Sequence, residues 1–76
     1  MKNQKGQYQT ITREGIDFRF LIVPTTLESG TKVFVWTLEN PYGEGTLEEN
    51  TSWSGELEAD IQAAAAAAAR RLNADR

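Results

Sequence analysis

The sequence of 76 residues contains no cysteine and no histidine. Without cysteine the chain can form no disulfide, and without either residue it lacks the usual ligands of a zinc site. The same absences remove the histidine general base, the Ser–His pair and the thiolate nucleophile from the catalytic options. We therefore expect a protein that is not an enzyme and that holds no metal or cofactor.

Long apolar runs are missing as well. The first twenty residues lack the apolar segment of a signal peptide, and no stretch reaches the roughly 18 apolar residues that a membrane-spanning helix needs. We expect a cytoplasmic protein that has no membrane partner.

Positive charge is absent from the middle of the chain, where no Lys or Arg occurs between Val33 and Ala69. The carboxylates of this segment are those of Glu39, Glu44, Glu48, Glu49, Glu56, Glu58 and Asp60. All but Glu39 form a candidate acidic patch that could face a basic partner. We favour a structural interpretation, in which they stabilise a helix start and solvate turns and a strand edge. Because the net charge is −3 and the pI is near 4.8, we expect no direct binding to nucleic acids.

Residue patterns divide the chain into a flexible N-terminal arm at residues 1–6 and a single α+β domain at 7–76. Apolar alternation predicts strands at 7–13, 16–23 and 31–39 and a weaker one at 45–53. Glu14-Gly15 predicts a two-residue hairpin, so that paired residues sum to 29 and Ile11 lies opposite Phe18. We expect a loop from Pro24 to Gly30, since proline has no ladder donor, and a turn at 40–43.

A helix is predicted from about residue 55 to 73, with Ser54 as its N-cap. Its apolar stripe comprises Leu57, Ile61, Ala64, Ala65, Ala68 and Leu72. The alanine run 63–69 predicts a smooth helix that lies close above bulky side chains. Drift in a tolerant helix and close approach of helices from two chains are the alternatives.

These elements predict an α+β fold: an antiparallel β-meander of three to four strands with one C-terminal alanine-rich helix packed on one face. The residues predicted to share the core are Phe18, Phe20, Phe34, Trp36, Leu57 and Ile61.

The second face of the sheet is left without a cover, because one helix can cover only one face. Alternation places an apolar patch there, made of Tyr8, Leu21, Val23, Val33 and Val35, and contiguous patches of this size tend to mark interfaces. An ordinary exposed face is the alternative, since β-branched residues are favoured in strands anyway.

Our leading hypothesis is a small non-enzymatic protein-interaction module that self-associates through this face, as a homodimer, or binds another protein there. The alternative is an acidic inhibitor that binds a basic nucleic-acid-binding surface on another protein. The small, acidic, motif-free chain is similar in character to phage-encoded inhibitors such as anti-CRISPR proteins, and no residue role follows from that similarity.

Overall fold

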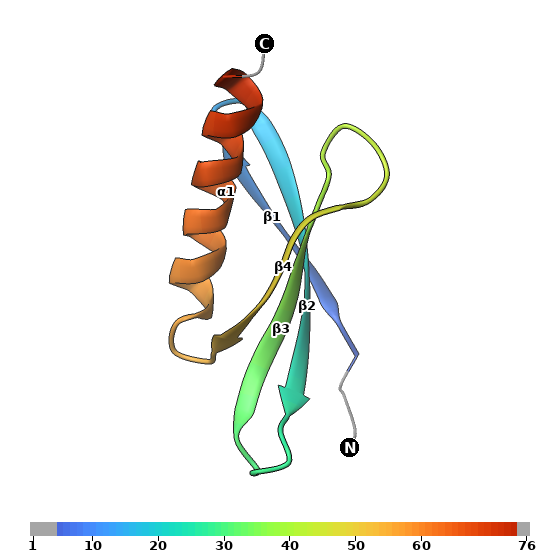
Figure 1. The fold of residues 1–76 in the computed structure, drawn as a ribbon, viewed down its shortest axis with the longest axis vertical. Coiled ribbons are helices and arrows are strands. Elements are labelled where there is room, and N and C mark those ends of the chain that lie inside the picture. The colour runs from blue at the N-terminus through green and yellow to red at the C-terminus, as the bar shows by residue number, and fades with distance from the viewer. Residues whose placement is uncertain (1–4, 75–76) are drawn as a thin grey trace.

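The computed structural model describes residues 5–74, which form four strands and one helix. In chain order these are β1 (Gln7–Arg13), β2 (Ile16–Thr26), β3 (Lys32–Glu39), β4 (Thr46–Trp53) and α1 (Leu57–Ala74). The strands make one antiparallel sheet in the order β1-β2-β3-β4, and α1 packs on one of its faces (Figure 1). The predicted α+β meander is confirmed. Most of the predicted N-terminal arm, residues 1–4, lies outside the described residues.

The first hairpin has the predicted register. Ile11 pairs with Phe18, and Tyr8 pairs with Leu21. Glu14 and Gly15 both have positive φ, 51° and 80°, as a two-residue type I′ turn requires. The twist of a type I′ turn matches that of the two strands. The turn type and the two-residue loop together fix the register, and the register decides which side chains share a face.

β2 is longer than predicted, and the prediction of a loop beginning at Pro24 is wrong. Pro24 lies inside β2 opposite Phe34. The N–H of Leu27 donates to the carbonyl of Thr31 (2.8 Å), so odd-numbered β2 residues bond toward β3 and even-numbered ones bond toward β1. β1 begins only at Gln7, opposite Ile22. The missing N–H of Pro24 therefore points past the start of β1 and removes no ladder bond.

The core lies between the sheet and α1. Its fully buried large side chains are Trp36, Phe18, Phe20, Leu38 and Ile61. The rings of Phe20 and Trp36 meet edge to face, with centroids 5.7 Å apart. Ala65 and Ala69 are completely buried against this layer, in agreement with the predicted use of small side chains. Phe34 and Leu57 are only partly buried at the periphery, so the core is centred nearer the first hairpin than predicted.

α1 begins two residues later than predicted, and Ser54 is not its N-cap. Ser54 lies in a turn at residues 54–56, and the carbonyl of Glu56 accepts the N–H of Asp60 (2.9 Å). Glu56 therefore holds the N-cap position.

A buried hydrogen-bond relay joins the helix start to the sheet. Trp36 Nε1 donates to Ser52 Oγ (2.8 Å), and the Ser52 hydroxyl donates to Asp60 Oδ2 (2.5 Å). The relay links β3, β4 and α1 through one small side chain, which is itself buried.

The helix covers only part of the sheet. Figure 1 views the sheet nearly edge-on, with α1 on one side and the loop at residues 40–45 leaning toward the other. The β2–β3 hairpin extends beyond the start of α1. Among residues 5–74, one face of the sheet thus has no helix over it.

Candidate interaction surface

The face away from α1, here called the open face, receives alternate side chains from every strand. Even-numbered residues of β1 and odd-numbered residues of β2 and β3 point to it, because their neighbours are buried under α1. Pairing aligns its side chains in rows across the sheet. Successive rows are Tyr8–Leu21–Thr37–Glu49, Val23–Val35–Thr51 and Thr25–Val33–Trp53.

The structure brings four of the five predicted interface residues together at the surface. Leu21, Val23 and Val35 are half-buried neighbours in β2 and β3, and Tyr8 is 53% exposed beside Leu21. Val33 differs, because it is only 4% exposed between Thr25 and Trp53. Val33 is covered by its neighbours and therefore offers almost no surface to a partner.

Trp53 belongs to this surface and escaped the sequence analysis. It is 57% exposed and pairs with Val33, whose side chain lies on the open face. Simple alternation gives Leu47 and Trp53 the same face, but Leu38 pairs with Glu48 while Glu39 pairs with Thr46. Leu47 is the extra residue of this β-bulge, and it lies beside α1 instead.

The open-face patch is therefore Tyr8, Leu21, Val23, Val35 and Trp53. At the border of the patch beside Tyr8, the charges of Arg19 and Glu39 neutralise each other. The guanidinium of Arg19 lies 3.7 Å from the centre of the Tyr8 ring, and its Nε is 3.8 Å from a carboxylate oxygen of Glu39. The exposed ion pair adds little stability, but together with the cation–π contact it holds Arg19 against the patch.

Gly6 shows how closely the N-terminal backbone approaches this patch. A Cβ at Gly6 would lie 2.8 Å from Cδ1 of Leu21 and 3.1 Å from Cγ2 of Val23. The backbone at Gly6 therefore covers one side of both residues.

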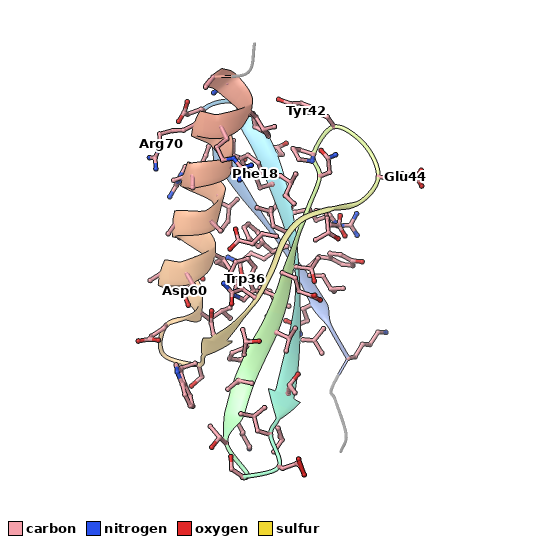
Figure 2. All side chains as sticks on the ribbon, viewed as in Figure 1. Phe18, Trp36, Tyr42, Glu44, Asp60 and Arg70 are labelled. Atoms are coloured by element: carbon pink, nitrogen blue, oxygen red, sulfur yellow. The ribbon has the colours of Figure 1, made fainter. Side chains whose placement is uncertain are left out.

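The predicted acidic patch does not form one surface. Glu48 and Glu49 point to opposite faces of β4, since their partners are Leu38 and Thr37. Glu44 lies on the loop and points away from the sheet, on the side opposite Asp60 (Figure 2). Glu58 accepts hydrogen bonds from Gln62 (2.9 Å) and from Gln9 (3.4 Å). Glu56 is exposed at the helix start, and Asp60 bonds to Ser52.

Within residues 5–74, no three Asp or Glu side chains cluster so that they could hold a metal ion. None of the described helices combines the length and hydropathy needed to cross a membrane. No protein-family model, curated protein or solved structure matches this chain.

Proposed function

We propose that this protein is a non-enzymatic interaction module that associates with a second copy of itself through the open face. The observation that carries the proposal is the open-face patch, in which an exposed Trp and an exposed Tyr flank three half-buried aliphatic side chains. Tyr, Trp and Arg are the residues that most often dominate binding energy in protein interfaces.

A second copy fits the charge and size of this face. The patch carries no charge of its own, so two patches can meet without bringing like charges together, although the chain has a net charge of −3. The whole open face, with four strands about 4.8 Å apart and about eight residues long, has a footprint of about 500 Å². The patch is its uncharged part, and the charged side chains of this face, Asp17, Arg19, Glu39 and Glu49, lie outside it.

The main test is the mass of a charged variant in solution. Val35→Lys places an uncompensated charge at the centre of the patch, and we expect it to convert a dimer to a monomer. Ala63→Lys is the matched control, because it makes the same charge change at an exposed position on α1. Light scattering and circular dichroism report mass and folding for each protein.

Trp53→Ser is a second test of the interface, which remains informative if the Val35→Lys protein fails to fold. Trp53 is more than half exposed, so the single chain should stay folded without its side chain, although Val33 becomes less covered, while the interface loses an anchor. Equal masses for the parent, Trp53→Ser and Ala63→Lys proteins would refute self-association through this face. A parent that is monomeric and captures a nucleic-acid-binding protein would point instead to the inhibitor alternative.

A further inference from the structure

The two edge strands of the sheet differ in how their free backbone groups are protected. β4 carries Glu48 and Glu49 side by side and contains the β-bulge, and both features discourage pairing with another strand. β1 has neither. Residues 8–12 are uncharged and lack proline, and β1 pairs with β2 without interruption from Gln7 to Arg13. An edge of this kind is a template for a further strand.

The outward backbone groups of β1 are those of Tyr8, Thr10 and Thr12. A two-residue hairpin closes on a hydrogen-bonded pair, Arg13 with Ile16, so the odd-numbered residues of β1 bond to β2. Side chains of β1 on the helix side are already engaged, since Gln9 bonds to Glu58 and Arg13 bonds to Gln62. These contacts hold the strand in place. Within residues 5–74, the outer N–H groups of Tyr8, Thr10 and Thr12 have no partner, and among their carbonyls only that of Thr12 has one, a long bond from the guanidinium of Arg13 (3.5 Å).

We propose that β1 pairs antiparallel with β1 of a second copy, across a two-fold axis at Thr10, to give a continuous eight-stranded sheet. In this register paired residues sum to 20. Thr10 faces Thr10, Tyr8 faces Thr12, and Arg13 faces Gln7. All seven residues of the strand are paired, and each strand keeps its open-face side chains on the same side of the joint sheet.

Avoidance of like charges favours this register over its neighbours. With the axis at Thr10, Lys5 of one copy faces Gly15 of the other, and Arg13 faces Gln7, so no two like charges lie directly opposite each other. Moving the axis to Gln9 would place Lys5 opposite Arg13, and like charges directly opposite each other are destabilising. Moving it to Ile11 would place Glu14 opposite Tyr8 and leave Gln7 without a strand partner.

This edge contact goes beyond the proposed association of open faces and does not depend on it. It lies in the plane of the sheet, whereas the open-face contact lies above that plane, so the two can coexist in one assembly. Two perpendicular two-fold contacts of this kind would join four chains.

Disulfide trapping tests the edge contact directly, because the natural chain has no cysteine. In Thr10→Cys, the two thiols face each other with Cα atoms about 5.5 Å apart, within the range that a disulfide spans. Thr12→Cys is the matched control, exposed on the same strand and face. Its two Cα atoms would be about 14 Å apart, since four residues separate each from the position opposite its counterpart.

We expect mild oxidation to convert most of the Thr10→Cys protein to a covalent dimer and to leave Thr12→Cys monomeric on a denaturing gel. Equal trapping of both, or trapping of Thr12→Cys alone, would overturn the proposal. Thr10→Pro provides a second readout, since it removes only an outward N–H and should lower the native mass while circular dichroism stays unchanged. An unchanged mass for folded Thr10→Pro would also overturn it, whatever Val35→Lys does to the open face.

Discussion

Glu14 is the described non-glycine residue with positive φ, and it occupies the first central position of the β1–β2 turn. The left-handed region costs most L-residues roughly 1–2 kcal/mol, and Asn is among the residues that tolerate it best. We expect Glu14→Asn to raise the free energy of unfolding by about 0.5–1 kcal/mol. Urea unfolding measures the change. The Asn73 side chain would lose an exposed hydrogen bond to Glu14, which is worth less than the relieved strain. A variant no more stable than the parent would contradict this account of the turn.

We expect the small side chain of Ser52 to contribute strongly to stability, because both of its hydrogen bonds lie at the junction of sheet and helix. Ser52→Ala would leave the buried indole N–H of Trp36 and one Asp60 oxygen without a partner. Such a loss costs about 1–3 kcal/mol of unfolding free energy. Ser54→Ala is the control, because Ser54 is exposed in the turn before the helix and should change stability little. If thermal melting ranked the two variants equally, the relay would not matter for stability.

At the scale of the element, we expect the alanine run to serve the close packing of α1 on the sheet. Ala65 is fully buried against the core, whereas Ala63 is exposed. We expect Ala65→Leu to overpack this contact and lower stability by about 1–3 kcal/mol. The same change at Ala63 should cost only a few tenths of a kcal/mol, because Leu is nearly as good a helix former as Ala. Denaturant midpoints of the two proteins make the comparison.

Equal tolerance of leucine at both positions would mean that the helix does not need small side chains. Drift of the sequence in a tolerant helix, one of the alternatives named above, would then be the preferred explanation of the alanine run. The structure already distinguishes the two faces of the run, since Ala64, Ala65, Ala68 and Ala69 are buried and Ala63 and Ala67 are exposed. That division follows the helical period and gives the experiment its matched pair.

At the scale of the whole molecule, the core lies toward the first hairpin and thins toward the second. Phe18 is fully buried, whereas Phe34 is partly buried near the β2–β3 hairpin, which extends beyond the start of α1 (Figure 1). We expect Phe18→Ala to cost about 3–5 kcal/mol, which is comparable to the total stability of so small a domain. Phe34→Ala should cost roughly half as much, because less apolar area leaves the water there on folding.

Thermal unfolding followed by circular dichroism separates these two variants. The Phe18→Ala protein should be largely unfolded at 25 °C, while the Phe34→Ala protein should show a cooperative transition at a reduced temperature. A larger loss of stability for Phe34→Ala than for Phe18→Ala would contradict a core centred near the first hairpin.

Local features of the sequence determined the elements and much of their arrangement. The two-residue loop at Glu14-Gly15 determined the register of the first hairpin, because a loop of that length allows only one pairing. Alternation in β2 and β3 identified the buried face, and the helical period identified the buried stripe of α1. Four of the five predicted interface residues lie at the open surface for the same reason, since side-chain direction in a strand is a property of neighbouring residues.

Only the tertiary structure decided how much each of those side chains is covered. The bulge beside Glu39 sends Leu47 to the helix side and leaves Trp53 on the open face, and an offset of one residue between two strands leaves no mark in the alternation. Pro24 is accepted in β2 because β1 starts too late to need its N–H, which depends on where another strand begins. Phe34 is only partly buried because the β2–β3 hairpin extends beyond the start of α1 (Figure 1), whereas Val33 on the other face is buried between Thr25 and Trp53. Burial depends on contacts between residues far apart in the chain, and local periodicity carries no information about them.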